Sequence, residues 1–582
     1  MNEFKGLLFN HKVAIILALF TCFLVTFPQI YFRIDHKDDG IYQGIELLPD
    51  APWSARVREI QDGHGFGSIY YKDGKNDPYL FQPVGSTVVA YMGSLLSLDI
   101  NNTILLSRFV LPFIAFIVLY VFVYLLFRDK AMALASASLI LLGESVLSYS
   151  GVERLIRGIS PTSFLELARP VNSAMIFIPF FGFLISFWTF HKNKKWQYGA
   201  LSAILLGLNF YNYFYTWTYL YAFGGVLFII FLLRRGWQEV VRISSVFVGA
   251  LLLLVPYALN IYRASQHPTY DEVSLRFGIV MTYAPLFVGF VVIGALLVFL
   301  LGFPREDRKK YYFGLALLLT PFVTMNQQLI TGKILQPGHY HWYFHKPIAI
   351  IFVLSVIFYV LNRLNWFSIK KMFATTLIAI SLATGVIVQA GSYYSDYASR
   401  DGGYIAIERQ KYGPVMKWFN DNANKEDVVL ANDEASHMTV IYTSLNVFYH
   451  RAGLYTLSAT EKRLLDVLFT FYRLREVGES DVRDVFYDER GYLSANIYGM
   501  HYKEVFGLYE AIPDDKIEEI LEEYLETLST PTSEWLRGTL SKYEVEYIIW
   551  DKKENPSWQL DRFNFLEQRA GFGDLVIYQV IP

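Results

Sequence analysis

The stretch TILLSRFVLPFIAFIVLYVFVYLLFRDK, residues 103–130, decides the fold class of this chain. Residues 103–127 are almost all apolar, and a helix of roughly 20 such residues crosses the hydrocarbon core of a bilayer. The run ends in a basic cluster, FRDK (127–130), of the kind that marks the cytoplasmic end of a span. The stretch therefore predicts a transmembrane helix.

The same pattern recurs through the first two thirds of the chain and predicts about eleven spans. The apolar runs are 13–31, 103–127, 131–147, 173–190, 198–213, 215–233, 242–262, 279–302, 312–330, 347–364 and 372–390. The pair 198–213 and 215–233 is separated by YNYFYTW and is open to a second reading, as one broken helix plus another. With the N-terminus inside, the basic connectors all fall on the cytoplasmic side: 127–130, 191–195, 234–236, 305–310 and 362–371.

Composition supports a membrane protein and excludes several other classes. Of 582 residues, 53% are hydrophobic and 18% are charged, against about 25% charged in soluble proteins. The net charge of −2 gives no basic field for nucleic acid. The single cysteine, Cys22, excludes an intrachain disulfide and a cysteine-based zinc site. The first run has no small-residue cleavage site, so we expect an uncleaved signal anchor.

This topology places the long polar segments on one face, the exoplasmic face. They are the first loop 32–102, the loops 148–172, 262–278 and 331–346, and the tail 391–582. We therefore expect a transmembrane domain over 1–390 and an exoplasmic α/β domain over 391–582. The short inner connectors favour a prokaryotic plasma membrane with the C-terminal domain outside, although an endoplasmic reticulum topology would look the same.

The tail has the pattern of a small α/β domain. EDVVLANDEASHMTVIY predicts a strand followed by a helix, and YEVEYIIWDKK and FGDLVIYQVI predict two more strands. DDKIEEILEEYLETL predicts an amphipathic helix. The tail has no glycine-rich phosphate loop and no nucleophile elbow, so nothing indicates independent catalysis there.

The first exoplasmic loop contains the densest polar stretch, DAPWSARVREIQDG (50–63), which predicts a short helix. Pro52 suits its first turn and Gly63 ends it. Asp50 either caps this helix or, at the membrane–water boundary, accepts a proton from a hydroxyl or amine acceptor. Glu46 and Asp39 are competing catalytic acids. Arg58 and Asp62 are spaced for an i,i+4 ion pair.

A metal site is a weaker interpretation of the polar cluster at residues 36–39. HKDD (36–39) contains oxygen ligands suited to a divalent cation such as Mg²⁺ or Mn²⁺, but such sites need several converging groups. We therefore assign no metal ligand and leave a divalent cation open as a cofactor.

The pattern Asp50, Trp53, Arg56, Glu59 and Asp62-Gly63-His64 resembles the first exoplasmic loop of the C-type (GT-C) membrane glycosyltransferase superfamily. That superfamily includes oligosaccharyltransferases, protein O-mannosyltransferases and aminoarabinose-lipid transferases. The resemblance implies a polyprenyl-phosphate sugar donor and inversion at the anomeric carbon. It also implies that Asp50 is the catalytic base and that Arg56 and Glu59 lie at the substrate. Two departures are Ala51, where many relatives have a second acid, and a tail without the Trp-Trp-Asp-Tyr-Gly signature, which argues against protein N-glycosylation.

A polyprenyl-phosphate donor requires cations near the membrane surface, and two loops supply them. GVERLIRGISPTSFLELARPVNS (151–173) contains Arg154, Arg157 and Arg169, whose guanidinium groups suit phosphate, although Arg154 and Arg157 also fit interfacial anchors. NQQLITGKILQPGHYHWYFHKP (326–347) is the second loop, and its candidate ligands are Lys333, His339, His341 and His345. An aromatic interfacial belt and a zinc site are the alternatives for this loop.

Polar residues inside apolar runs are costly and mark functional positions. Glu144 is one, and Tyr211, Asn212 and Tyr215 at the break in 198–233 are others. Tyr211 and Tyr215 suit the lining of a cavity, whereas Asn212 favours a hydrogen bond to a neighbouring helix.

The leading hypothesis is a membrane glycosyltransferase that moves a sugar from a polyprenyl-phosphate or pyrophosphate donor to a glycan, lipid or protein acceptor on the exoplasmic face. Asp50 would deprotonate the acceptor, and the loop cations would stabilise the leaving phosphate. A lipid-linked glycan transporter or flippase is the alternative, but the chain shows no internal repeat and no charges at mid-membrane. A non-catalytic scaffold is a third reading.

Overall fold

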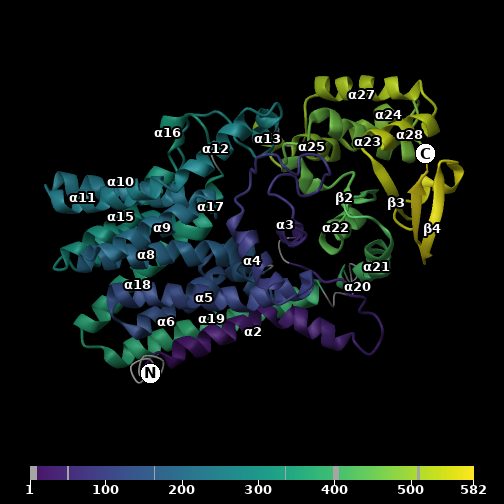
Figure 1. Cartoon of the computed structure of the whole chain (residues 1–582). Coiled ribbons are helices and arrows are strands. Elements are labelled where there is room, and N and C mark those ends of the chain that lie inside the picture. The colour runs from purple at the N-terminus through teal and green to yellow at the C-terminus, as the bar shows by residue number, and fades with distance from the viewer. Residues whose placement is uncertain are drawn as a thin grey trace. The chain divides into compact units, whose positions relative to one another are not determined.

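The computed structural model describes residues 10–48, 51–162, 164–334, 336–396, 405–506 and 511–581. The chain divides into two units, each built from segments that are separated in the sequence and can be found in Figure 1 by their residue colours. The first comprises the chain up to His36 with Gln82–Ala258 and Thr282–Ile405. The second comprises Lys37–Phe81, Leu259–Met281 and Ala406–Pro582.

The first unit is helical. Its longer helices are α2 (Lys12–Asp35), α4 (Val84–Ser94), α5 (Ile100–Phe127), α6 (Lys130–Ser138), α8 (Met175–Asn193), α9 (Trp196–Asn209), α10 (Phe214–Leu233), α11 (Trp237–Leu251), α14 (Phe290–Gly302), α15 (Arg308–Thr324), α18 (Lys346–Arg363) and α19 (Phe367–Asp396). Its short helices are η1 (Leu139–Gly143), η2 (Glu144–Leu147), α7 (Tyr149–Ile156), η3 (Glu166–Ala168), η4 (Pro170–Ala174), α16 (Gln328–Thr331), α17 (Pro337–Tyr340) and η5 (His341–His345). Helices α12 (Leu254–Ser265) and α20 (Ile405–Arg409) each include residues of both units.

Among the described residues, seven helical segments are long and apolar enough to cross a membrane, so the chain is a multi-pass membrane protein. They are Lys12–Asp35, Ile100–Phe127, Lys130–Leu147, Pro170–Asn193, Phe214–Leu233, Pro337–Arg363 and Phe367–Tyr394. Helices α11 and α12 form an eighth span if the pair, bent by 52°, is counted as one.

The expected number of about eleven spans is therefore not confirmed in the described part of the chain. The remaining runs, 198–213, 279–302 and 312–330, form α9, α14 and α15, which are helices of 14, 13 and 17 residues. Polar residues or breaks in the helix interrupt each of these apolar runs, so each helix covers only part of its run. The segments 198–213 and 215–233 form two separate helices, α9 and α10.

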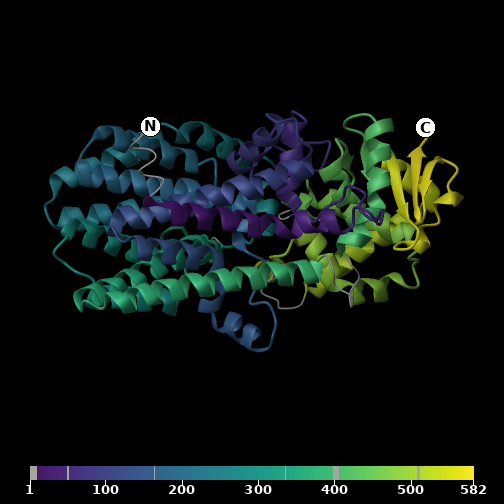
Figure 2. The ribbon, with the colours of Figure 1, turned by 90° about the horizontal axis from the view of Figure 1, so that it is seen from below.

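Helix α5 shows how the sequence sets a span. Asp99 begins it, because its side chain accepts a hydrogen bond from the backbone N–H of Asn102, and Arg128 ends it in the left-handed conformation at φ 60°. Helix α2 packs against α5 and α19, and α19 also packs against α6, as Figures 1 and 2 show. Buried Arg108 of α5 donates hydrogen bonds to Gln29 Oε1 and Val25 O of α2, which satisfies a cation inside the bundle.

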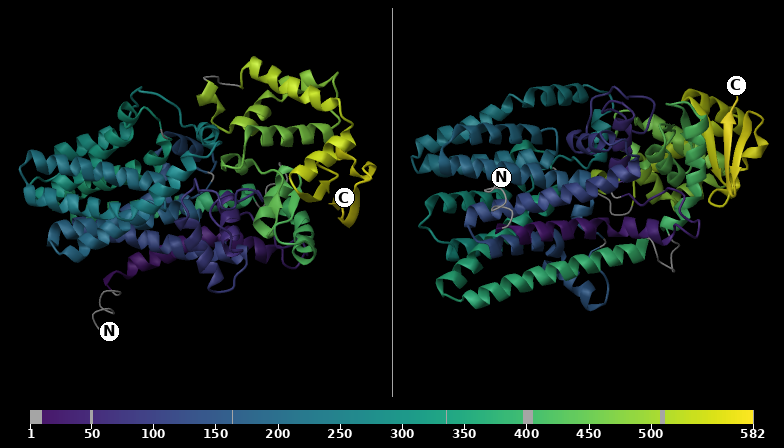
Figure 3. Two further views of the ribbon diagram at one scale, coloured as in Figure 1. Left: turned by 45° about the horizontal axis from the view of Figure 1, so that its top comes forward. Right: turned by 60° about the horizontal axis from the view of Figure 1, so that its bottom comes forward.

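Helix α7 differs from its neighbours because it projects from the side of the helical unit, as Figures 2 and 3 show in blue. Ser148 caps it by accepting a hydrogen bond from the backbone N–H of Gly151. Its apolar residues Tyr149 and Ile156 are exposed, as is typical of a helix at a membrane interface.

The second unit contains the tail together with two segments from the loops of the first 390 residues, 37–81 and 259–281. Its helices are α3 (Ala51–Gln61), α13 (Tyr270–Arg276), α21 (Gly413–Asn422), α22 (Asp433–Tyr442), α23 (Glu461–Leu474), α24 (Val482–Asp488), α25 (Arg490–Tyr498), α26 (Tyr502–Phe506), α27 (Asp514–Leu528) and α28 (Thr532–Lys542), with 3-10 turns η6 (Gln410–Tyr412), η7 (Arg451–Tyr455), η8 (Pro556–Trp558) and η9 (Leu560–Arg562). The polar loop that begins at residue 37 thus folds with the tail.

A five-stranded sheet in the order β2-β1-β3-β5-β4 forms the centre of the tail. Its strands are β1 (Val428–Leu430), β2 (Asn446–Val447), β3 (Val545–Asp551), β4 (Leu566–Phe572) and β5 (Leu575–Val580). Strand β1 pairs in parallel with β2 and β3, whereas β5 pairs antiparallel with β3 and β4. The predicted strands at β1, β3 and β5 and the predicted helix at α27 are confirmed.

Two apolar cores hold this unit together. One packs α21 and α22 on the sheet around Val429, Phe419 and Ile577, and it includes Ile45 from the first polar loop. The other packs α23, α24 and α27 around Leu468, Phe486 and Tyr524. Burial of Ile45 in the first core fixes the loop just before α3, because apolar area removed from water stabilises the packed arrangement.

Candidate functional site

The predicted helix of the first polar loop is confirmed as α3, which begins at Ala51 with Pro52 in its first turn. Gly63 follows its end at φ 85°, a conformation that favours glycine. The predicted i,i+4 pair also forms, with Arg58 Nε 3.0 Å from Asp62 Oδ2. Asp50, the predicted base, lies outside the described residues, so its role stays a prediction.

The two competing acids lie in different surroundings. Glu46 is 3% exposed, and its Oε1 accepts a hydrogen bond of 2.8 Å from the hydroxyl of Tyr42. Its backbone N–H donates to the hydroxyl of Tyr442 on α22. Asp39 is exposed, and its Oδ1 accepts a hydrogen bond from the backbone N–H of Ile41 in a local turn. Glu46 thus joins the loop to the tail, whereas Asp39 shapes its own turn.

Buried Glu59 lies at the centre of a charge network of partly buried side chains, which we call the His64 network: Glu59, His64, Lys75 and Glu426. His64 Nδ1 lies 2.6 Å from Glu59 Oε2, and its Nε2 is paired with Glu426. Lys75 Nζ lies 2.9 Å from both carboxylate oxygens of Glu59. The hydrogen bond that Glu59 accepts raises the pKa of His64 despite the partial burial of the ring, because it favours the charged form.

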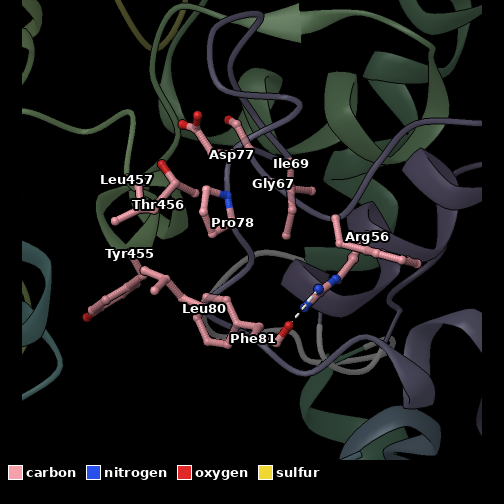
Figure 4. A pocket seen from close by; sticks show the side chains of 12 residues that line it. Arg56, Gly67, Ile69, Asp77, Pro78, Leu80, Phe81, Tyr455, Thr456 and Leu457 are labelled. Atoms are coloured by element: carbon pink, nitrogen blue, oxygen red, sulfur yellow. Dashed lines mark hydrogen bonds between the residues drawn. The ribbon is translucent and has the colours of Figure 1, made fainter. Parts of the chain in front are cut away.

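Arg56 lies on the same helix, and within the described part of the chain it forms no ion pair with an acid. It is 2% exposed, and its Nη2 donates a hydrogen bond of 2.7 Å to the backbone oxygen of Phe81, drawn dashed in Figure 4. The ring of Trp53 lies 5.9 Å from the guanidinium carbon. Burial lowers the pKa of Arg56 to about 10.

In the helical unit, Arg154 and Arg157 lie at and just after the end of α7. Arg154 Nε donates a hydrogen bond of 2.7 Å to the backbone oxygen of Ser160, and Arg157 Nη2 lies 2.5 Å from Glu153 Oε1. Both side chains are exposed. These contacts are local to α7 and its following turn, so both the anchor reading and the phosphate reading stay open for them.

Arg169 belongs to a second group of charges. It lies 3.8 Å from Glu166, its guanidinium stacks on the ring of Phe164, and Ser173 Oγ donates a hydrogen bond to Glu166. Tyr213, just before α10, is close enough to Arg169 and Glu166 for their charges to act on its hydroxyl. The loop before α8 thus meets the break between α9 and α10.

The loop before α18 reaches the same place. The hydroxyl of Tyr213 and Nδ1 of His339 are hydrogen-bonded, and the His339 ring stacks on Tyr215 at a centroid distance of 4.7 Å. The hydroxyl of Tyr215 also donates to Gln336 Oε1 at 3.4 Å. Predicted site residues Arg169 and His339 are therefore brought together through Tyr213. We call Glu166, Arg169, Tyr213, Tyr215 and His339 the Arg169 cluster.

A further ion pair lies beside this cluster. Lys346 Nζ, at the start of α18, lies 2.5 Å from Glu144 Oε1 in η2, and Glu144 also experiences the charge of Glu166. The pairing gives a partner to the partly exposed acid that the sequence marks as costly. Lys346 was not among the predicted site residues, because a lysine at the first residue of a span has the pattern of an ordinary anchor.

The remaining predicted residues lie apart from the Arg169 cluster. His345 is 1% exposed, and its Nε2 lies 3.0 Å from Thr324 Oγ1. His341 is half-buried, and Lys333 is exposed beside α16. Tyr211 donates a hydrogen bond of 2.6 Å to the backbone oxygen of Leu253. Asn212 donates to the backbone oxygen of Met175 at 2.7 Å, the interhelical bond expected for it.

Metal ligands do not gather in the described part of the chain. No group of three or more His, Cys, Asp or Glu side chains among these residues is placed to hold a metal ion. This includes the described residues of HKDD (36–39) and the three histidines at 339, 341 and 345.

No protein-family model matches the chain, and no curated protein sequence matches it. Two solved structures are similar along most of its length. One is the Archaeoglobus fulgidus oligosaccharyltransferase tethered to an acceptor peptide, at 12% identity and TM-score 0.47, covering 93% of this chain and 69% of the other. The second is ArnT from Cupriavidus metallidurans bound to undecaprenyl phosphate, at 10% identity and TM-score 0.43, covering 96% and 97%. Both TM-scores are below 0.5, so function is argued below from this chain's own residues.

Proposed function

We propose that this chain is a membrane glycosyltransferase that moves a sugar from a polyprenyl-phosphate donor to a nucleophilic acceptor on the exoplasmic face. The observation that supports this proposal is the Arg169 cluster. Three segments far apart in the sequence, 166–173, 213–215 and 336–346, supply a guanidinium, an imidazole, two phenols and a nearby ammonium within one part of a helical membrane unit. Ionisable groups at a bilayer are retained for function by default.

The chemistry of this cluster suits a leaving phosphate. Arg169 offers a planar guanidinium of the kind that binds two oxygens of one phosphate, and it lies 3.8 Å from Glu166. His339 and the phenols of Tyr213 and Tyr215 add hydrogen-bond donors and stacking faces beside it. Fixed donors aimed at developing negative charge lower the barrier for departure of a leaving group.

The proposed transfer is a displacement at the anomeric carbon. The bond between this carbon and the phosphate oxygen breaks, and its electron pair leaves with the phosphate. The acceptor oxygen or nitrogen forms the new bond from the opposite side, which inverts the configuration, and its proton passes to the carboxylate of Asp50. Arg154, Arg157 and Lys333 would attract the anionic donor to the surface, while the tail would help to select the acceptor. A divalent cation, Mg²⁺ or Mn²⁺, remains part of the proposal as an optional aid.

The test is sugar transfer by the purified full-length protein from a panel of radiolabelled polyprenyl-phosphate sugars. We expect one donor to turn over, and Asp50→Asn to reduce the rate by about 10²–10⁴-fold, the usual contribution of a general base, while donor binding survives. Asp421→Asn serves as the matched control because Asp421 is an exposed residue of α21 paired only with Lys417 on its own helix. Equal turnover by Asp50→Asn would move the base to Glu46 or Asp39.

A lipid-linked glycan transporter is the competing function, and the same protein distinguishes it. Reconstituted in vesicles, a transporter would move the labelled lipid between leaflets without forming a new glycosidic bond. Movement without transfer, or no turnover of any donor, would overturn the proposal in favour of the transporter or of a scaffold.

A further inference from the structure

Arg56 is a buried cation that pairs with no acid among the described residues. Its guanidinium is 2% exposed and makes one hydrogen bond, from Nη2 to the backbone oxygen of Phe81. Nε and Nη1 are buried and have no hydrogen-bond partner within the described residues. The groups that act most on its charge are the phenols of Tyr70 and Tyr79, which are neutral at ordinary pH.

Two other buried arginines of the same unit are paired with acids, and a third, Arg473, donates three hydrogen bonds to Thr527, Thr530 and Thr532. Arg276, 3% exposed, donates to the backbone oxygens of Ile497 and Ala459 and pairs with Glu272 at 3.0 Å. Arg463 pairs with Asp73 at 2.9 Å while its guanidinium lies between two tyrosine rings. Each of these arginines has an acid partner or makes more hydrogen bonds than Arg56, and an unpaired buried charge destabilises the folded state strongly.

Arg56 also lines a pocket, which Figure 4 shows from close by. The pocket lies between the chain around Gly67 and Ile69, the turn from Asp77 to Phe81, and the segment Tyr455–Leu457 of the tail. Ser68 lines it as well, and its hydroxyl oxygen accepts a hydrogen bond from the backbone N–H of Tyr71, which leaves the hydroxyl proton to be donated elsewhere. A buried guanidinium and a hydroxyl donor thus line the same small cavity.

We propose that this pocket binds a small anionic group, a phosphate or a carboxylate, with Arg56 as the residue that holds it. An anion supplies both the hydrogen-bond acceptors that Nε and Nη1 lack and the negative charge that the surroundings lack. A water molecule would supply only the acceptors. The carboxylate of Asp77 also lines the pocket and repels anions, so the group binds at the Arg56 end. This inference does not depend on sugar transfer.

The experiment measures thermal unfolding of the purified full chain in detergent, at fixed pH and ionic strength, with chloride replaced stepwise by inorganic phosphate or acetate. A ligand that binds only the folded protein raises Tm with its concentration. We expect the wild-type Tm to rise by several degrees and Arg56→Met to show no rise. In chloride, Arg56→Met should unfold no earlier than the wild type, because the substitution removes an uncompensated buried cation. Arg537→Met, which removes an exposed arginine of α28, should respond as the wild type does.

Two further arms complete the test. Dihexanoyl phosphatidic acid replaces inorganic phosphate in one: a rise with this lipid alone identifies a lipid headgroup, and a rise with inorganic phosphate identifies a free anion. In the other, phosphate should slow the reaction of wild-type Arg56 with phenylglyoxal, read by mass spectrometry, which needs no variant to fold. A wild-type Tm and an Arg56 reactivity that are indifferent to all three anions, or a rise retained by Arg56→Met, would overturn the inference.

Discussion

The two charge clusters of this protein are built from the same kinds of side chain but are closed to different degrees. In the His64 network, the imidazole of His64 lies between Glu59 and Glu426, and Lys75 contacts both oxygens of Glu59. In the Arg169 cluster, the guanidinium lies 3.8 Å from Glu166 and over the ring of Phe164.

This difference separates a structural role from a binding role. Charges that satisfy one another in a buried site hold segments together and have little capacity left for a ligand. The His64 network does this between the first polar loop and the tail, since His64 and Glu426 lie far apart in the sequence but in one unit. A guanidinium beside aromatic faces presents a planar fork of donors that suits a phosphate.

Glu59→Gln gives the largest expected effect on this comparison. The substitution leaves Lys75 without its acid and removes one of the two acceptors of His64, and breaking a buried ion pair costs about 3–5 kcal/mol. We expect a clear fall in the Tm of the full-length protein, measured by intrinsic fluorescence. Asp421→Asn breaks an exposed pair in the same unit and should leave Tm nearly unchanged.

The sequence resemblance places Glu59 at the substrate, so the same variant distinguishes the two roles. A Glu59→Gln protein with wild-type Tm and a strongly raised KM would return Glu59 to substrate binding. It would also remove the distinction between a structural His64 network and a ligand-binding Arg169 cluster.

Arg169→Gln gives the next largest effect, on activity rather than on stability. Loss of one oriented donor to a developing charge costs about 10²–10³-fold in rate. We expect a loss of this size in kcat/KM for the donor, with a Tm close to that of the wild type because the pair with Glu166 is long and partly exposed.

Arg305→Gln is the matched control for Arg169, since Arg305 is an exposed arginine of the same unit that contacts a backbone oxygen and the ring of Tyr311. It should transfer sugar at the wild-type rate. If Arg169→Gln instead lowered Tm while a refolded fraction kept full turnover, the Arg169 cluster would be structural like the His64 network.

Local signals predicted much of this arrangement. The apolar runs located the spanning helices, and Pro52 and Gly63 set the start and end of α3 within a residue or two. The i,i+4 spacing was sufficient to predict the Arg58–Asp62 pair, because both residues are on one turn of one helix. Short runs rich in β-branched and aromatic residues located β3 and β5.

Long-range partners were not predictable from one sequence. Nothing near His64 indicates Glu426, and nothing near His339 indicates Tyr213, because folding rather than spacing brings these pairs together. The loop 37–81 was assigned to the transmembrane domain by chain order, yet it groups with the tail through contacts such as Ile45 in the core of α21 and α22. Short strands such as β2, with two residues, have too little pattern to detect.

The pH dependence of stability tests the His64 network, and the expected change in Tm is smaller. The pKa of His64 is raised in the folded protein by Glu59, so its stabilisation is complete below the unfolded value of about 6.5 and is lost as pH rises through the folded pKa. We expect the wild-type Tm to fall more than that of His64→Gln above pH 6.5. The pKa values of His437 and His450 are lowered by burial, so these groups act in the opposite direction and below that range. Parallel pH profiles for the two proteins would show that His64 is neutral when folded.

Arg58→Ala gives the smallest expected effect and tests whether every charge on α3 belongs to the His64 network. The pair with Asp62 spans one helical turn, and both side chains are partly exposed, so its loss costs about 0.3–0.5 kcal/mol. Burial raises the pKa of Asp62 although Arg58 lowers it, and the backbone oxygen of Asp62 accepts a hydrogen bond from Lys425 that survives the substitution. We therefore expect a barely measurable change in Tm and unchanged transfer. Lost transfer at unchanged Tm would instead place Arg58 at the substrate.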